Sequence, residues 1–199
     1  MKGKVVFLIA PPAAGKGTQA RVLTAQGFHH VEMSKVLAGR SPLTARELNG
    51  PNLVNSTIVI EALKDYLEPF PEEQDLVLDG FPRTEAQARF AVSYFGQIHV
   101  AFVIIEADDL VCINRVKERY DVDLMNHQEN GGVPPRASDF PEVHEERLKV
   151  YRREMVELED FLMHHVPERV HRVNGHLSAD NIAEWIRKDV IGPHIGLAN

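Results

Sequence analysis

The sequence predicts an α/β fold, a doubly wound parallel sheet with helices on both faces. Three apolar runs, at residues 5–9, 76–78 and 100–105, are short and nearly continuous, which is typical of strands buried on both faces of a parallel sheet. Segments with helical patterning separate these runs, and this alternation favours right-handed crossover connections. The chain has 199 residues, of which 44% are hydrophobic, and is long enough to bury one substantial core. We therefore expect a single domain over residues 1–199.

The other elements continue this alternation along the chain. Residues 28–31 and 169–173 are weaker strand candidates. The segments expected to be helical are residues 18–26, 55–68, 84–96, 108–119, 143–166 and 178–190. Residues 33–68 place small helices between the second and third strands, and residues 120–141 form a long irregular stretch rich in Gly, Pro, Asn and Asp. Such stretches in a compact domain are usually functional lids or disordered segments.

Charge and cysteine content argue against several classes of protein. A formal net charge of −7 argues against a general nucleic-acid-binding or anionic-membrane surface, because such surfaces need an excess of Lys and Arg. Cys112 is the single cysteine, so neither an intramolecular disulfide nor a Cys-rich zinc site is expected. No apolar stretch approaches the roughly 20 residues that a membrane helix needs. These features predict a soluble, cytoplasmic protein without nucleic-acid or membrane partners.

Residues 10–18, Ala-Pro-Pro-Ala-Ala-Gly-Lys-Gly-Thr, follow the first predicted strand and open a helix. In this context backbone N–H groups converge on phosphate oxygens, a lysine reaches the outer phosphates and a hydroxyl approaches magnesium. Lys16 and Thr18 would fill these side-chain roles. Ala10 and Ala13 stand where such loops often have glycine, so either alanine would distort the loop if its position needs a positive φ. Taken alone, the segment could also be an ordinary strand–turn–helix junction.

A second signature strengthens the first. Residues 79–84, Asp-Gly-Phe-Pro-Arg-Thr, follow the third predicted strand, and Gln87 lies just downstream. Together with residues 10–18, called the phosphate loop below, this signature resembles the adenylate kinase family of P-loop nucleoside monophosphate kinases. The resemblance runs through almost the whole chain and includes Arg115, Arg119, Arg136, Asp139 and Arg147 on the two sides of the expected lid.

The resemblance implies a P-loop NTPase fold with a five-stranded parallel sheet. The core would comprise residues 1–32, 69–118 and 142–199. Residues 33–68 would form a monophosphate-binding helical insert, and residues 119–141 would form a mobile lid.

The resemblance also implies an enzyme that reversibly transfers a phosphoryl group from ATP to AMP, giving two ADP. Magnesium would be the cofactor, ATP the co-substrate, nucleotide biosynthesis the context and a monomer the working form. Phosphoryl transfer needs two substrates held in line and positive charge around the moving group, which arginine forks supply well. The residues implied to be catalytic are Lys16, Arg83, Arg119, Arg136 and Arg147.

On the donor side, Lys16 and Arg119 would hold the phosphates and Arg115 would stack on the base. Asp79 and Thr18 would hold magnesium, mainly through water, because this ion keeps several waters in nucleotide sites. The residues implied to bind ATP are Pro12, Ala13, Ala14, Gly15, Lys16, Gly17, Thr18, Arg115 and Arg119.

The acceptor side departs from the family. Gln87 matches the residue that reads adenine, but the usual Thr-Gly-Asp run and its following arginine are replaced by Met-Ser-Lys-Val-Leu-Ala at residues 33–38. A lost charge-assisted contact typically costs about 1.5–3 kcal/mol, so we hypothesise that Arg40 binds the acceptor phosphate, with Lys35 as the other candidate. The residues expected to bind AMP are Met33, Ala38, Arg40, Val54, Gly80, Arg83, Gln87, Arg136 and Arg147.

Other functions stay open at this stage. Alanines at positions 10, 13 and 38 are compatible with a nucleotide-binding protein whose catalysis is lost or altered. The acceptor could also be CMP, UMP or a small metabolite, since one core fold hosts many acceptors. His127 lies in the expected lid without cysteines or a paired histidine, so no zinc is expected.

Overall fold

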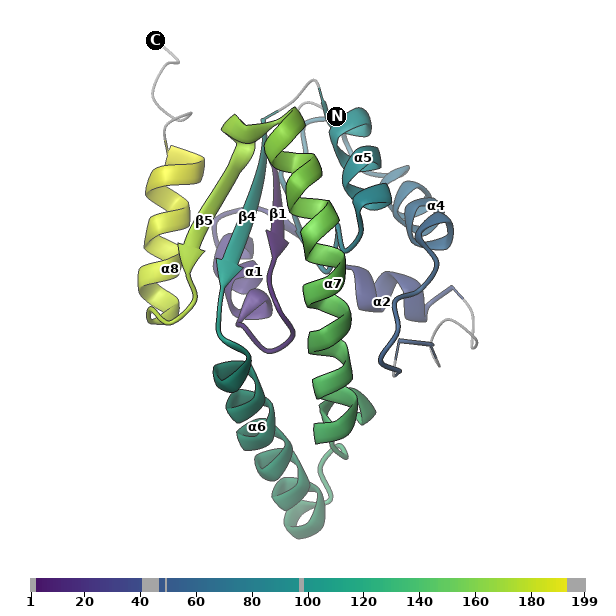
Figure 1. The fold of residues 1–199 in the computed structure, drawn as a ribbon, viewed down its shortest axis with the longest axis vertical. Helices are drawn as coiled ribbons and strands as arrows, with labels where there is room; N and C mark the ends of the chain where they lie inside the picture. The colour runs from purple at the N-terminus through teal and green to yellow at the C-terminus, as the bar shows by residue number, and fades with distance from the viewer. Residues whose placement is uncertain (1–2, 41–46, 49, 97–98, 193–199) are drawn as a thin grey trace.

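The computed structural model describes residues 3–40, 47–48, 50–96 and 99–192 (Figure 1). Its centre is a five-stranded, entirely parallel sheet in the order β2-β3-β1-β4-β5. The strands are β1 (Val5–Ile9), β2 (His29–Glu32), β3 (Leu76–Asp79), β4 (Val100–Glu106) and β5 (Val170–Asn174). The predicted fold class is confirmed.

Helices cover both faces of the sheet because alternate strand residues point to opposite sides. One face packs against α1 (Lys16–Thr24) and α8 (Ala179–Trp185), and a π-helical turn at Ile186–Ile191 continues α8. The other face packs against α4 (Ser56–Leu67), α5 (Glu85–Tyr94) and α7 (Pro141–His165) (Figure 1). The remaining helices of the described residues are α2 (Met33–Ala38), α6 (Asp109–Asn130) and the short 3-10 turns Ala137–Asp139 and Pro167–Arg169.

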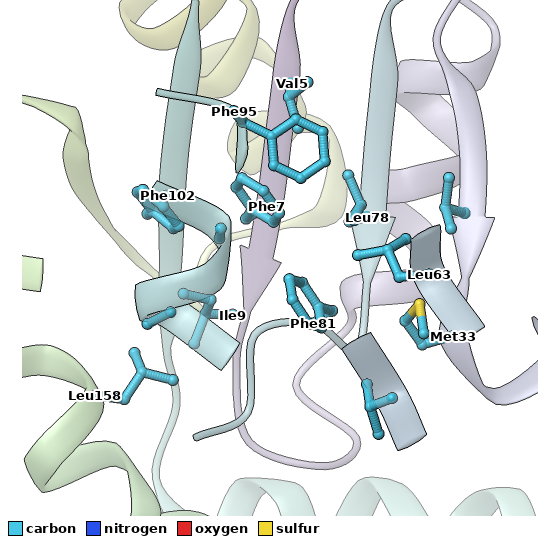
Figure 2. Close-up of a cluster of buried hydrophobic side chains, with 14 of the residues drawn as sticks. Val5, Phe7, Ile9, Met33, Leu63, Leu78, Phe81, Phe95, Phe102 and Leu158 are labelled. Atoms are coloured by element: carbon cyan, nitrogen blue, oxygen red, sulfur yellow. The ribbon is translucent and has the colours of Figure 1, made fainter. Parts of the chain in front are cut away.

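An aromatic cluster anchors the central strands under α5 and α7. The Phe7 ring of β1 stacks on Phe102 of β4 at a centroid distance of 4.8 Å, and Phe95 meets it edge-on at 5.5 Å (Figure 2). All three side chains are almost completely buried, and burial of an aromatic or large aliphatic side chain contributes about 1.5–3 kcal/mol. Phe7 lies two residues before the end of β1, so this packing fixes the point at which the phosphate loop leaves the sheet.

The expectation of an irregular stretch over residues 120–141 is wrong for its first half. Helix α6 continues for 22 residues to Asn130, and only residues 131–136 are irregular before a 3-10 turn. Residues 121–130 contain neither Gly nor Pro, so nothing in them breaks the helix. Their mostly polar composition fits a part of α6 that leaves the body of the protein and is largely exposed (Figure 1). Gly131, with φ 65°, ends the helix in the left-handed conformation that glycine adopts readily.

The region between β2 and β3 has the expected small helices, α2 and α4. Residues 41–46 and 49 of this region lie outside the described residues. No helix in the described part of the chain is long and apolar enough to cross a membrane.

Candidate active site

The phosphate loop leaves the carboxyl end of β1, the middle strand of the sheet, and turns into α1. Within it, Ala13 has φ 66° and Gly15 has φ 100°, whereas Ala10 is not among the described residues with positive φ. Replacement of glycine therefore matters at position 13 and not at position 10. A residue with a Cβ in the left-handed region costs about 1–2 kcal/mol, so the loop is held in this shape by its surroundings.

Lys16 lies inside the loop that it would serve. Its Nζ donates hydrogen bonds to the carbonyl oxygens of Ala10 at 2.8 Å and Pro11 at 3.2 Å. Burial lowers the pKa of Lys16 to about 8, although the Asp79 carboxylate partly opposes the shift and Arg83 adds to it. A buried ammonium with only carbonyl partners and a depressed pKa would gain from a nearby anion, which is what a phosphate supplies.

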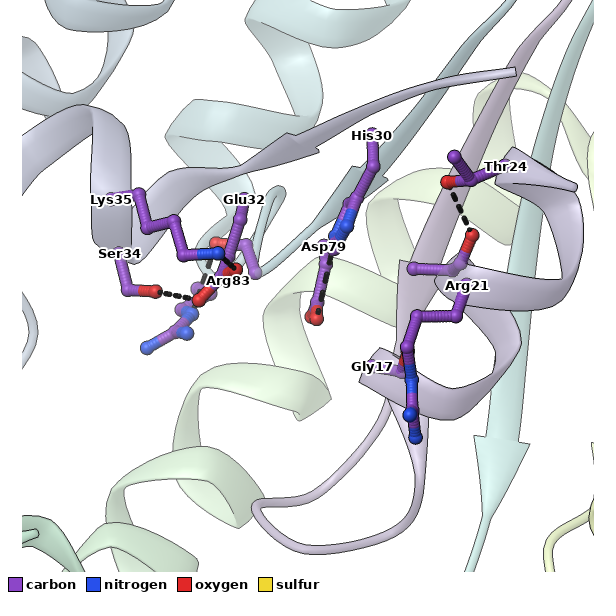
Figure 3. Close-up of polar contacts among 11 residues, drawn as sticks. Gly17, Arg21, Thr24, His30, Glu32, Ser34, Lys35, Asp79 and Arg83 are labelled. Atoms are coloured by element: carbon purple, nitrogen blue, oxygen red, sulfur yellow. Dashed lines mark hydrogen bonds and ion pairs between the residues drawn. The ribbon is translucent and has the colours of Figure 1, made fainter. Parts of the chain in front are cut away.

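Asp79 ends β3, directly beside the loop. Its Oδ2 lies 4.0 Å from His30 Nε2, as Figure 3 shows, and a Cβ at Gly17 would lie 3.8 Å from the same oxygen. The carboxylate therefore faces the first turn of α1, which also carries Thr18. Carboxylate and hydroxyl oxygens are the donors that Mg²⁺ prefers. The described residues contain no group of three or more His, Cys, Asp or Glu that could hold a metal.

A first cavity lies between the sheet, α2 and α7. Its apolar wall includes Met33, Leu37, Val54 and Val59, and its polar lining comes from Lys16, Ser34, Gly80, Arg83, Gln87, Arg147 and Tyr151. The expected acceptor residues Met33, Val54, Gly80, Arg83, Gln87 and Arg147 are thus brought together. An apolar cavity with a few convergent polar groups is the usual form of a small-molecule site.

The two arginines of this cavity are half-buried, and among the described residues neither forms an ion pair with a carboxylate. Burial lowers the pKa of Arg83, and burial followed by repulsion from Arg83 lowers the pKa of Arg147 to about 10. Arg83 Nε donates to the carbonyl oxygen of Gly80 at 3.0 Å. Gly80 has φ 87°, and a Cβ there would lie 2.8 Å from Arg83 Nη2. Glycine is therefore required for the arginine to fold back into the cavity.

Gln87 is almost completely buried and forms part of the same cavity lining. Its Oε1 accepts a hydrogen bond from the backbone N–H of Arg83 at 2.8 Å, and its Nε2 donates to Ser56 Oγ at 3.4 Å. The amide thus links α5, α4 and the residue 79–84 signature, which fixes its orientation at the cavity wall.

A second cavity lies on the other side of Lys16. The phosphate loop lines it from Ala13 to Thr18, together with Arg115, Arg119, Arg136 and Gly175. Arg115 donates to the carbonyl oxygens of Ala14 at 3.4 Å and Gly175 at 3.2 Å. Lys16 lines both cavities, so the two expected substrate regions meet at this ammonium group.

The two arginines of the expected lid, Arg119 and Arg136, differ in their contacts. Arg119 donates from Nε and Nη2 to the two carboxylate oxygens of buried Asp139, at 2.8 and 2.6 Å. Arg136 lines the cavity and is exposed. In this conformation Arg119 is held by Asp139, whereas Arg136 forms no side-chain hydrogen bond or ion pair with the described residues.

The structure does not bring Ala38 and Arg40 to the site. Ala38 is exposed at the end of α2 and lines neither cavity. Arg40 lies two residues further and donates to Asp65 at 2.9 Å, with Glu61 at 3.7 Å. The reason is that the backbone stays helical through Gly39, with φ −72°, which turns Arg40 towards the acidic side of α4. That Arg40 binds the acceptor phosphate stays a prediction, and in this structure Arg40 is paired with Asp65 and Glu61 instead.

Tyr151 and Ser34 are among the lining residues of the first cavity that the sequence analysis did not single out. Tyr151 lies four residues after Arg147 on α7 and lines the first cavity beside it, as residues four apart on a helix do. This spacing was the available signal. Ser34 carried no signal of its own, because its place at the cavity wall depends on how α2 packs.

Comparison with known proteins fits this geometry. Residues 9–129 match the family described as AAA domain. The chain is 32% identical over 172 residues to the adenylate kinase of Deinococcus radiodurans, covering 80% of this chain and 84% of that protein. It is 30% identical over 198 residues to that of Deinococcus deserti, covering 94% and 96%, and 29% identical over 167 residues to that of Methylorubrum extorquens, covering 78% and 81%.

Proposed function

Since the chain belongs to the adenylate kinase family of nucleoside monophosphate kinases, we propose that it transfers a phosphoryl group reversibly from ATP to AMP, giving two ADP. The observation that supports this proposal is that two cavities meet at one half-buried lysine. Lys16 lines both of them, with the phosphate loop on one side and two half-buried arginines, Arg83 and Arg147, on the other.

The second cavity, which is lined by the phosphate loop and is called the donor cavity from here on, suits a nucleoside triphosphate. The phosphate loop offers backbone N–H groups and Lys16 to the phosphate oxygens, while Arg119 and Arg136 add charge from the lid side. Arg115, tied to Ala14 and Gly175, offers a planar guanidinium on which a base can stack. Asp79 and Thr18 would hold magnesium, which would neutralise charge on the donor phosphates.

The first cavity, called the acceptor cavity from here on, suits a monophosphate whose base lies against an apolar wall. Arg83 and Arg147 would bind the phosphate, since two adjacent, half-buried cations gain from an anion placed between them. Gln87 and the apolar residues Met33, Val54 and Val59 would surround the base. The two arginines suit a phosphate and the apolar wall suits a base, so the cavity favours a nucleotide over a small polar metabolite.

The protein's own contribution to catalysis would be alignment and charge. Lys16, Arg83 and Arg147 would surround the phosphoryl group as it moves from one cavity to the other, and little covalent chemistry is needed. Closure of residues 119–141 would bring Arg119 and Arg136 onto the donor and exclude water, which limits hydrolysis of ATP. Arg119 would first have to share or leave Asp139.

An acceptor screen tests the proposal. The protein is mixed with ATP and magnesium, and AMP, CMP, UMP, GMP or no acceptor is added, while the nucleotides are followed by chromatography. AMP-dependent formation of ADP is expected. Turnover with only another monophosphate would overturn the choice of substrate, and ATP binding without any turnover would favour a nucleotide-binding protein that has lost catalysis.

A further inference from the structure

Helix α2 borders both cavities of the site. Met33, Ser34 and Leu37 line the acceptor cavity, whereas Lys35, between them in sequence, lines the donor phosphate cavity. A lysine side chain on this helix therefore stands where the two cavities adjoin. Within the described residues 33–40, 47–48 and 50–68, Lys35 is the one Lys or Arg that lines either cavity.

Lys35 is held loosely. Its side chain is 80% exposed, and its Nζ lies 2.7 Å from Glu32 Oε2, three residues earlier (Figure 3). Exposed ion pairs of this kind contribute about 0–1 kcal/mol, so a phosphate can compete for the ammonium at little cost. Glu32 also accepts a hydrogen bond from Ser34 Oγ at 2.9 Å and therefore keeps one partner when Lys35 leaves.

The other cation near α2 is committed elsewhere. Arg40 is paired with both Asp65 and Glu61, in a groove that does not include the phosphate loop. Lys35 lines this groove too, but unlike Arg40 it also lines the cavity of the phosphate loop. Position 38, where the family's arginine would be expected, is an exposed alanine. The donor phosphates already have Lys16, Arg119 and Arg136 around their cavity, whereas the acceptor side lacks a cation from α2.

We propose that Lys35 leaves Glu32 and binds the phosphate of the acceptor nucleotide, replacing the arginine that is absent from position 38. This inference rests on the proposed function, because it assigns a residue to the same acceptor site. It also gives Glu32 a role as the resting partner of Lys35. Although partial burial opposes the shift, hydrogen bonds from Lys35 and Ser34 lower the pKa of the Glu32 carboxyl, which favours its ionised form as the resting partner.

The test compares AMP affinity and kinetics in four variants. In Lys35→Met, the AMP dissociation constant from calorimetry and the KM for AMP should rise at least about tenfold, as expected for loss of a charge-assisted contact. The KM for ATP should change less than about twofold. Lys149→Met is the matched control, because Lys149 forms a similar exposed pair with Glu146 three residues earlier and lines neither cavity. Its AMP affinity should be unchanged.

The double variant Glu32→Gln/Lys35→Met separates direct contact from simple neutralisation of Glu32. If Lys35 contacts the phosphate, AMP binding stays as weak as in Lys35→Met; a return to wild-type affinity would overturn the proposal. So would an unchanged AMP affinity in Lys35→Met, a change confined to ATP, or a tenfold loss in Arg40→Met instead.

Failure of the proposed function gives a different pattern of results. If the wild-type protein binds AMP without turning it over, catalysis is refuted, and the dissociation constants still decide the role of Lys35. If the wild-type protein does not bind AMP at all, the assignment of Lys35 is overturned as well.

Discussion

Substitution of Ala13 by glycine should stabilise the protein, although most substitutions in a phosphate loop would be expected to do harm. Ala13 has φ 66°, and relief of a left-handed residue with a Cβ is worth about 1–2 kcal/mol. Glycine also gains about 0.4–1 kcal/mol of conformational freedom in the unfolded chain, which opposes the effect. The difference is a gain of about 0.8 kcal/mol in the free energy of unfolding, or about 2–3 °C in Tm for a chain of this size.

The neighbouring Ala14 provides a matched control. Ala14 is buried and is not among the described residues with positive φ, so Ala14→Gly should lose about 1–2 kcal/mol from added backbone freedom and the deleted methyl group. Urea denaturation of both variants and the wild-type protein, without nucleotide, measures the difference. A lower stability of Ala13→Gly, or a shift of both variants in the same direction, would refute the account of backbone strain in the loop.

Three further predictions concern the site. Gly80→Ala should displace Arg83, because the added Cβ would lie 2.8 Å from Arg83 Nη2 and the backbone φ at this position is 87°. The KM for AMP should then rise at least about tenfold, as expected for loss of a charge-assisted contact. An unchanged KM for AMP in steady-state kinetics would be inconsistent with this packing. Asp139→Asn should reduce the free energy of unfolding by about 1–3 kcal/mol, since it breaks the two-point contact between a buried carboxylate and Arg119; denaturation curves that coincide with wild type would speak against it. ATP binding near pH 8.5 should take up protons, because burial lowers the pKa of Lys16 to about 8 and a bound phosphate raises this pKa again. Calorimetry in buffers of different ionisation enthalpy measures the proton uptake. Lys16→Met should abolish it.

Lys16 also predicts the direction in which the free energy of unfolding changes with pH in the absence of ligand. The folded pKa of Lys16, about 8, lies below its ordinary value of 10.5, so between these values the unfolded chain binds more protons than the folded one. The contribution of Lys16 to the free energy of unfolding therefore increases as pH rises through this window. Lys16→Met should remove that increase, which pH-dependent denaturation of the two proteins can compare.

The sheet could be predicted from sequence because its strands are buried on both faces and read as short apolar runs. The runs at 5–9 and 100–105 lie within β1 and β4, and the weaker candidates are β2 and β5 with a shift of one residue at their starts. Long exposed helices carry less signal. The end of α6 was misjudged because its polar residues resemble a loop in composition, and only Gly131 marks the true boundary.

The site was predictable where a residue's place follows from a strand end or a motif, as for Lys16, Asp79 and Arg83. It was not predictable where helix packing decides. The sequence offered both Lys35 and Arg40 as replacements for the missing arginine, and only the geometry of α2 against α4 separates them. The need for positive φ at position 13, and not at position 10, likewise depends on the path of the loop.

The most direct test of the central claim is the stoichiometry of the reaction with AMP. With magnesium and limiting ATP in the presence of excess AMP, we expect two ADP to appear for each ATP consumed, and none when AMP is omitted or when Lys16 is replaced by methionine. Formation of one ADP with inorganic phosphate, independent of AMP, or bound ATP that is never consumed, would contradict the assignment of this site to phosphoryl transfer between nucleotides.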